Sequence, residues 1–319
     1  MTKKSQTPET TRPPFRILIS FHTWRNRDLD ALFGPITQRF DLDVFADSGA
    51  FSAWTIGAPI QVEEYAAWLK RWSHWFAAAA NLDVISTLPT AGFLEGHRNF
   101  QWLQDQGLHP IPVFHAGEPQ DRLYEYIETY PYIALGGLVG AKPRNRGMLR
   151  FFVNAFKYAQ NHSPNTCFHM FGLTDWRIAH LYPWFSTDST SWIAPVRFGD
   201  IKVFDPVTGI MMAGKSRNIM RAGKKKVNIF LRWMARHNID LASTVDRSKQ
   251  SSYDLCYMGA LAYLEAEAWV RAKRPTMPVP APYTGHAGPK VYMVHSATTY
   301  FSEHMRAVER LCEEGTIHV

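Results

Sequence analysis

Asp47-Ser48-Gly49-Ala50-Phe51-Ser52 follows the apolar run at 42–46, which predicts a short buried strand. An acid, a hydroxyl and a glycine at the end of a buried strand are typical of α/β enzymes, because glycine lets the backbone approach a ligand closely. In three later stretches an apolar run also ends in Gly or Asp. They are Tyr-Ile-Ala-Leu-Gly-Gly-Leu at 132–138, His-Met-Phe-Gly-Leu at 169–173 and Phe-Ser-Thr-Asp-Ser-Thr at 185–190. In this order, the four stretches predict a site built from the ends of several strands.

The composition indicates a globular chain with a sizeable core. At 319 residues it is long enough for two average domains or for one α/β barrel with additions. The hydrophobic content of 46% excludes global disorder. Three cysteines without a CxxC pair argue against a disulfide framework and against a cysteine-rich zinc site, and they fit a reducing compartment. We therefore expect a cytoplasmic protein.

Residues 1–14 are polar and contain no apolar segment, which predicts a flexible lead rather than a signal peptide or a membrane anchor. No later run approaches the roughly 20 apolar residues that a membrane helix needs. The net charge of +7 and the isoelectric point of about 9.3 favour a polyanionic partner. The 11 tryptophans could stack on bases, although tryptophan more often fills a core.

Apolar runs alternate with helical patterns along the first 190 or so residues. Strands are expected at 16–21, 43–46, 83–86, 111–114, 133–135, 167–171 and 184–187. Helices are expected at 29–40, 62–80, 92–106, 120–129, 147–160 and 175–182. Strands separated by such helices form parallel sheets. About seven units without a GxGxxG motif favour a (β/α)8 TIM barrel over a doubly wound sheet, with 239–242 as one candidate for the eighth strand.

After residue 191 the alternation ends. A β-hairpin is expected at 198–213, followed by a basic segment at 215–226 and by helices at 227–237 and 253–273. A Pro/Gly linker and a tail follow, and the tail has one strand-like run at 291–294 and one helix. We therefore expect three parts. They are a lead at 1–14, a barrel at 15–274 with an insertion at about 198–226, and a linker with a C-terminal extension at 275–319.

Taken together, these motifs resemble the tRNA-guanine transglycosylase superfamily. Asp47-Ser48-Gly49-Ala50-Phe51 is similar to its Asp-Ser-Gly-Gly-Phe motif, and Leu135-Gly136-Gly137-Leu138 to its base-recognition loop. His169-Met170-Phe171-Gly172 is similar to a family segment that contains Met and Gly, and Asp188 falls where the family has its nucleophilic aspartate. The resemblance covers about residues 15–192. It implies a barrel enzyme that exchanges a base on a nucleic acid.

The chain departs from the family pattern at several points. It lacks the Cys-x-Cys-x-x-Cys zinc module, and Ser189-Thr190-Ser191-Trp192 replaces the Pro-Thr-Arg that usually follows the nucleophile. The second acid of the family has no clear counterpart, because Asp83 is expected at the start of its strand, and His115 replaces a Gln. A compact form without zinc is similar to the phage and bacterial branch that inserts 7-deazaguanine bases into DNA. The resemblance therefore implies DNA before tRNA.

Base exchange needs a nucleophile for the sugar C1′ atom and an acid/base group for the two bases. A carboxylate can form the covalent glycosyl-enzyme, as in retaining glycosidases. The resemblance makes Asp188 the nucleophile and Asp47 the general acid/base. The alternatives are structural: Asp188 as a cap that bonds Thr190 or Ser191, and Asp47 as an ordinary turn aspartate.

The expected base pocket includes residues from the first three motifs and two further polar residues. They are Ser48, Gly49, Phe51, Asp83, His115, Gly136, Gly137, Leu138, Met170 and Gly172. Phe51 and Met170 are expected to sandwich the base, or else to pack in the barrel. His115 would bond the base or the sugar, or else be a satisfied structural histidine. Asp83 would bind the base or have a buried structural role.

A cluster of six positive charges follows the predicted hairpin. It comprises Lys215, Arg217, Arg221, Lys224, Lys225 and Lys226. The cluster suits the phosphates of a nucleic acid, although such a run is often only a solvated face. The target base has to leave the duplex to reach a pocket, so flipped or unpaired nucleotides are expected.

The sequence leaves several functions open. The first is a DNA transglycosylase that replaces guanine with a 7-deazaguanine as co-substrate, without a metal or redox cofactor. The others are a tRNA transglycosylase, a base-excising glycosidase and an inactive nucleic-acid-binding relative. A sugar-phosphate barrel enzyme would need a glycine-rich phosphate loop after the seventh or eighth strand, and residues 186–191 contain no glycine.

Overall fold

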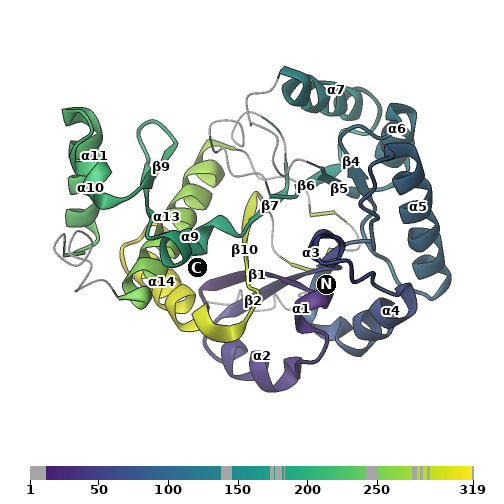
Figure 1. Ribbon diagram of the computed structural model, residues 1–319, viewed down its shortest axis with the longest axis horizontal. Helices are drawn as coiled ribbons and strands as arrows, with labels where there is room; N and C mark the ends of the chain where they lie inside the picture. Colours follow the sequence, from purple (N-terminus) through teal and green to yellow (C-terminus); the bar gives the residue numbers. More distant parts are fainter. Residues whose placement is uncertain are drawn as a thin grey trace, which may run out of the picture.

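The structure is a computed structural model, and it describes most of the chain. The described residues are 12–137, 146–172, 176, 182, 184–240, 251–274, 279–280, 283–285 and 288–317. They form one curled parallel sheet surrounded by helices, with a small β-hairpin and two helices on one side (Figure 1).

Eight parallel strands form the sheet. In chain order they are β1 (Pro14–Ser20), β2 (Asp41–Asp47), β3 (Phe76–Ala79), β4 (Val113–His115), β5 (Tyr132–Gly136), β6 (Cys167–Met170), β7 (Ser186–Ser189) and β10 (Lys290–Val294). Their order in the sheet is β3-β2-β1-β10-β7-β6-β5-β4. A parallel bridge between Ala80 and Ile111 connects the segments that follow β3 and precede β4, at the two edges of the sheet. The curled sheet is compatible with a TIM-like α/β fold.

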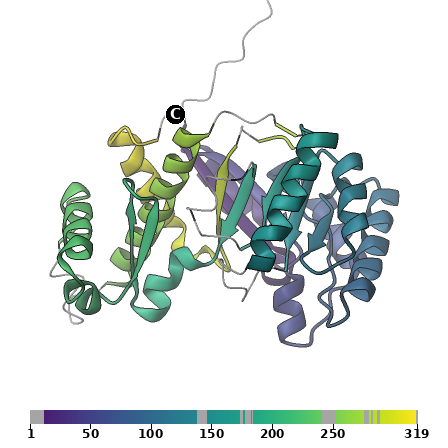
Figure 2. The ribbon, with the colours of Figure 1, turned by 90° about the horizontal axis from the view of Figure 1, so that it is seen from above.

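Helices cover the outside of the sheet. They are α1 (Phe21–Trp24), α2 (Leu29–Thr37), α3 (Ala50–Thr55), α4 (Val62–Arg71), α5 (Pro89–Asp105), α6 (Gln120–Thr129), α7 (Arg146–His162), α9 (Ala194–Phe198), α13 (Ser252–Lys273) and α14 (Phe301–Glu313). The antiparallel hairpin β8 (Ile201–Asp205) and β9 (Ile210–Gly214) leads into α10 (Ser216–Met220) and α11 (Lys224–Arg236). Figure 2 shows these last two helices beyond α13, away from the sheet.

Two apolar clusters lie on opposite faces of the strands, because successive side chains of a strand alternate. Ile17, Val44 and Leu135 pack outward against the helices. Phe45 and Tyr292 belong to the cluster that fills the interior of the curled sheet. Along β2, Asp43 and Asp47 share the parity of Phe45 and therefore face the interior as well.

The interior is polar where the strands begin. Asp43 is buried and accepts hydrogen bonds from the Tyr283 hydroxyl at 2.7 Å, the Tyr292 hydroxyl at 2.9 Å and the Lys290 ammonium at 2.5 Å. Burial opposes the charged carboxyl, but Lys290 and Arg16 outweigh it and hold the pKa of Asp43 below its usual value. Burial lowers the pKa of Lys290 to about 8. The ion pair therefore joins β2 to β10 inside the sheet.

Two expectations from the sequence are wrong in this region. The expected helix at 62–80 ends at Arg71, and Phe76–Ala79 is the third strand, β3. Residues 83–86, expected to be that strand, form an irregular segment beyond its end. Asp83 therefore follows the third strand instead of starting it.

The eighth strand is β10, which pairs with β1 on one side and with β7 on the other. The strand-like run at 291–294 was expected in a C-terminal extension, but it is part of the central sheet, so the boundary expected at 274 does not separate an added unit. Residues 239 and 240 are not in a strand, and 241–242 lie outside the described residues. The hairpin expected at 198–213 is present as β8 and β9. The helix expected at 175–182 lies almost wholly outside the described residues.

Removing the ammonium of Lys290 is expected to destabilise the protein strongly, because it leaves the Asp43 carboxylate buried without its partner. We expect Lys290→Met to lower the free energy of unfolding by about 3 kcal/mol or more, measured by urea denaturation. Lys157→Met, at an exposed position on α7, is the control and should change little. The double variant Asp43→Asn/Lys290→Met should recover part of the loss. Equal stability of Lys290→Met and the control would contradict the account of this ion pair.

Candidate active site

The carboxyl ends of parallel strands meet at one edge of a sheet, and enzymes with this architecture place their sites there. Here that edge carries Asp47 as the last residue of β2, His115 as the last residue of β4 and Asp188 near the end of β7. Asp83 follows the end of β3. Three carboxylates and an imidazole therefore lie around one opening of the curled sheet, which we call the mouth.

Asp47 is partly buried in the mouth and has no cationic partner among its described contacts. Its Oδ2 atom accepts a hydrogen bond from the Gly49 backbone N–H at 3.0 Å. Burial raises the pKa of Asp47 to about 7, and the nearby charges of Asp83 and Asp188 contribute to the rise. A carboxyl group with this pKa can both donate and accept a proton near neutral pH.

The turn after Asp47 needs a glycine. Gly49 has a φ of +77°, and a Cβ atom there would lie 2.7 Å from the His22 Cβ atom. Ser48 is buried, and its hydroxyl donates to Asp83 Oδ1 at 3.2 Å and accepts from the Ala50 N–H at 3.2 Å. Ser48 and Gly49 therefore shape the turn, and Ser48 also ties the end of β2 to Asp83.

His115 lies between two carboxylates. Its Nε2 atom is 3.0 Å from Asp83 Oδ2, and its Nδ1 atom is 3.1 Å from Glu118 Oε1. Glu118 Oε2 also accepts the backbone N–H of His115 at 2.8 Å. Burial alone would lower the pKa of His115, but the bonds to Asp83 and Glu118 outweigh it and raise that pKa to about 10. At neutral pH the imidazolium therefore fixes Asp83 at the mouth.

The position of Asp83 differs from the one expected from the sequence. Because Asp83 follows β3, an acid does stand after the third strand, and His115 holds it in place. Glu118 was not expected as a site residue. The sequence contains one signal for a contact between the two side chains: Glu118 follows His115 by three residues, in the turn after β4.

Gly136 and Gly137 make room for His115. A Cβ atom on Gly136 would lie 2.7 Å from the His115 Cδ2 atom, and one on Gly137 would lie 3.0 Å from the Ala116 backbone nitrogen. Gly137 also has a φ of +73°. The two glycines are therefore required by the packing of the neighbouring strand end, apart from any role with a ligand. Leu138 lies outside the described residues.

The carboxylate of Asp188 is contacted by one residue of β6 and by one residue that follows this strand. Its Oδ1 atom accepts the Gly172 backbone N–H at 2.8 Å, and the His169 Nε2 atom lies 3.4 Å from the same oxygen. Gly172 has a φ of +67°, which favours glycine there. The N–H of Ser191 bonds the Ser189 hydroxyl at 3.0 Å, so Ser189 rather than Asp188 caps this turn.

The two residues expected to sandwich a base lie in different environments, one exposed and one buried. Phe51, on α3, is 48% exposed and has its ring centroid 6.2 Å from that of Trp54, which is also exposed. Met170 is fully buried in the outward-facing cluster, so its side chain does not face the mouth. Its neighbour Phe171 packs on the interior cluster and against His169, with ring centroids 4.5 Å apart. Met170 and Phe171 lie on opposite faces because neighbouring side chains alternate along a strand.

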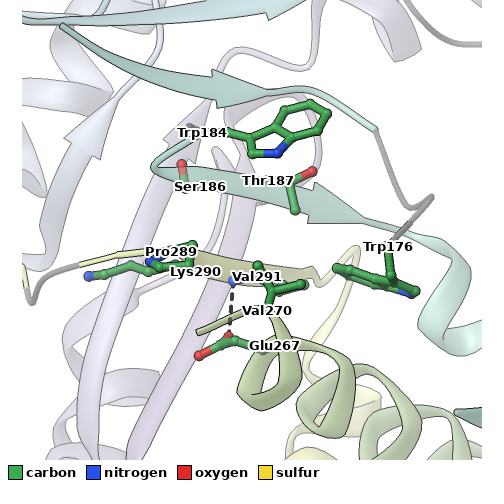
Figure 3. A pocket seen from close by; sticks show the side chains of 9 residues that line it. All are labelled: Trp176, Trp184, Ser186, Thr187, Glu267, Val270, Pro289, Lys290 and Val291. Atoms are coloured by element: carbon green, nitrogen blue, oxygen red, sulfur yellow. Dashed lines mark hydrogen bonds between the residues drawn. The ribbon is translucent and has the colours of Figure 1, made fainter. Parts of the chain in front are cut away.

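Two cavities adjoin the mouth. One, of about 140 Å³, is lined by His115, Glu118 and Gly137 together with Val84 and Pro89, among others. The other, of about 460 Å³, lies between the α3–α4 region and α5, and its lining includes Asp83, Trp54 and Asn99. A third pocket, drawn in Figure 3, lies between β7, β10 and α13, with a volume of about 20 Å³. It is lined mainly by apolar atoms and has room for about one water molecule.

The basic cluster lies on the hairpin-and-helix unit. Lys215, Arg221, Lys224, Lys225 and Lys226 are exposed there. Lys215 donates to the Phe198 carbonyl at 3.2 Å. The side chain of Arg217 lies outside the described part of the structure. The structure therefore does not bring these charges into the mouth, and they form a separate surface beyond α13 (Figures 1 and 2).

No model of a known protein family matches the chain, and no curated protein matches it.

Two further observations concern the described residues alone. None of their helices is both long and apolar enough to cross a membrane. In the same ranges, no three His, Cys, Asp or Glu side chains are grouped in a way that could hold a metal ion.

The raised pKa of Asp47 predicts a stability that depends on pH. The folded state binds the proton of the Asp47 carboxyl more tightly than the unfolded chain does. The contribution of this group to the free energy of unfolding is therefore fully present below pH 4 and is lost as the pH rises towards 7. Asp47→Asn keeps an oxygen for the Gly49 N–H and removes the charge. We expect the variant to exceed the wild type in free energy of unfolding by about 1 kcal/mol or more at pH 8, and by much less at pH 4. A variant that is less stable than the wild type at pH 8 would contradict the assignment.

Proposed function

We propose that this protein is a base-exchange transglycosylase that replaces guanine in DNA with a 7-deazaguanine. The observation that carries the proposal is the convergence of Asp47 and Asp188 on one mouth, with Asp47 held near a pKa of 7. The proposal includes a (β/α)8 barrel that carries residues 198–226 as an insertion, and a cytoplasmic location, in the host if a phage encodes the protein. The resemblance of four motifs to guanine transglycosylases supports it.

In the first half of the proposed reaction, an oxygen of Asp188 attacks the sugar C1′ atom and the bond from C1′ to the guanine nitrogen breaks. Asp47 gives its proton to the departing guanine, so the base leaves neutral. The product is a glycosyl ester of Asp188. Two carboxyl groups of different protonation state, one a nucleophile and one an acid, are what a retaining displacement requires.

In the second half, the incoming 7-deazaguanine loses a proton to Asp47, and its nitrogen attacks C1′. The ester bond breaks, and Asp188 is again a free carboxylate. Asp83, fixed by His115, supplies an acceptor for the N–H groups of either base. Phe51 and Phe171 offer aromatic surface at the mouth. Whether water or a base reaches the intermediate decides between exchange and excision.

DNA is the polymer that the chain favours. The family's zinc module, which handles tRNA, is absent from this sequence. The exposed basic cluster on α10 and α11 supplies charges for phosphates. A single-stranded or flipped nucleotide can enter the mouth, where a paired base cannot.

Covalent trapping tests the chemistry. Wild-type protein incubated with guanine-containing DNA should give a denaturation-resistant adduct that a free 7-deazaguanine resolves. Asp188→Asn should give none, because the amide is a poor nucleophile, and Asp47→Asn should slow adduct formation by roughly 100-fold or more. Asp105→Asn, an exposed change on α5, is the matched control. An adduct on tRNA alone would replace DNA with tRNA, and an unresolved adduct that only water releases would indicate base excision.

The basic cluster predicts a salt-dependent affinity. We expect Lys225→Glu/Lys226→Glu to weaken DNA binding and to reduce the slope of log K against log [salt] by roughly 0.9 for each lost phosphate contact. Lys70→Glu/Lys157→Glu makes the same change in charge on α4 and α7 and should have a smaller effect. Equal effects of the two pairs, measured by fluorescence anisotropy, would show that the cluster is only a solvated face.

A further inference from the structure

His169 is a fully buried histidine that points at the candidate nucleophile. It lies on β6 with a relative exposure of 0%, and its Nε2 atom is 3.4 Å from Asp188 Oδ1. That separation is wider than a well-formed hydrogen bond, and Nε2 has no hydrogen-bond partner among the residues that the structure describes. A buried polar nitrogen without a partner costs free energy, so its position needs an explanation.

The other side of the imidazole is held by a chain of hydroxyl groups. The His169 Nδ1 atom lies 2.7 Å from the Ser186 hydroxyl, which lies 2.6 Å from the Tyr132 hydroxyl. The three residues come from the adjacent strands β6, β7 and β5, and all face the interior of the sheet. The chain of contacts therefore runs from Tyr132 through Ser186 and His169 to Asp188.

The imidazole ring has little freedom to turn. It stacks on Phe45, with ring centroids 4.4 Å apart and planes 24° apart. It is T-shaped to Phe171, with ring centroids 4.5 Å apart. These contacts hold the ring with its Nε2 atom towards Asp188.

The protons of this chain can be assigned from its partners. Burial raises the pKa of Tyr132 well above its usual value, so the phenol keeps its proton, and Ser186 is its only acceptor among the described residues. The Ser186 hydroxyl, bonded by the phenol, then donates to His169 Nδ1. With Nδ1 as the acceptor of this bond, the ring N–H is on Nε2, which faces Asp188. The opposite tautomer would aim a lone pair at a carboxylate oxygen.

We propose that His169 is a positioning residue that holds the carboxylate of Asp188 through an Nε2–H donor, in a tautomer set by Tyr132 and Ser186. The inference rests on the proposed function for the role of Asp188. Both the Gly172 N–H and the His169 Nε2 atom lie at Oδ1, and no described donor lies at Oδ2. The arrangement therefore leaves Oδ2 free to attack the sugar, and the contact from Nε2 closes to a hydrogen bond when the substrate is bound.

The tautomer can be measured without any substrate. Nitrogen-15 NMR of protein labelled at histidine should show His169 with a protonated Nε2 and an unprotonated Nδ1 at neutral pH. Ser186→Ala should disturb this pattern, and Asp188→Asn should shift the Nε2 resonance. A protonated Nδ1 together with a bare Nε2 in the wild type would overturn the proposal, whatever reaction the protein performs.

The kinetic effect separates positioning from folding. His169→Gln keeps an N–H donor close to the Nε2 position, whereas His169→Phe keeps the ring shape and loses the donor. We expect His169→Phe to slow adduct formation roughly 10- to 100-fold with little change in KM, and His169→Gln to restore part of the rate. His162→Gln, an exposed change on α7, is the control.

The outcomes of the two measurements are distinct. Equal losses in His169→Phe and His169→Gln, in proportion to their thermal stability, would overturn the positioning role and leave the proposed function intact. Wild-type protein that forms no adduct, yet shows the Nε2–H tautomer and the response to Asp188→Asn, would overturn the proposed function and support the contact between His169 and Asp188.

Discussion

The two-residue alternation of side chains along eight parallel strands determines what this protein places inside its curled sheet. Residues of one parity pack against the helices, and those of the other parity fill the interior. On β2 the interior parity places Asp43 at the start of the strand, Phe45 in the middle and Asp47 at the end. The buried Asp43–Lys290 pair joins β2 to β10, and β10 lies between β1 and β7. The position of Asp188 relative to Asp47 therefore depends on this strand.

Much of the fold follows from local patterns, and the exceptions have physical causes. The helix at 120–129 and the hairpin at 201–214 are close to their expected bounds because periodicity and turn residues define them locally. The pattern predicts a helix at the third strand because Phe76-Ala77-Ala78-Ala79 consists of residues that also suit the preceding helix. The eighth strand was missed because β10 pairs with partners about a hundred or more residues away, across a Pro/Gly-rich segment.

In the candidate site, too, some features follow from local sequence patterns and others depend on contacts between distant segments. The positions of Asp47 and Asp188 at strand ends follow from the sequence because an acid after an apolar run is a local signal. The motif at 169–172 predicts Met170 as a base contact, whereas Phe171 is the residue that packs on the interior cluster. The roles of Glu118 and His169 depend on contacts between different strand ends or within a turn, which no local pattern specifies. Burial raises the pKa of Asp47, and the nearby charges of Asp83 and Asp188 add to the rise. Such an electrostatic cost is characteristic of a functional site.

The central claim is that the Asp188 carboxylate forms a bond to a sugar, and the most direct measurement locates that bond. DNA containing guanine would be incubated with the protein, the complex denatured and digested, and the modified peptide sequenced by mass spectrometry. The account predicts a deoxyribosyl ester on the peptide that contains Asp188, and its disappearance when a 7-deazaguanine is added. A sugar attached to any other side chain, Asp47 and Asp83 included, would contradict it.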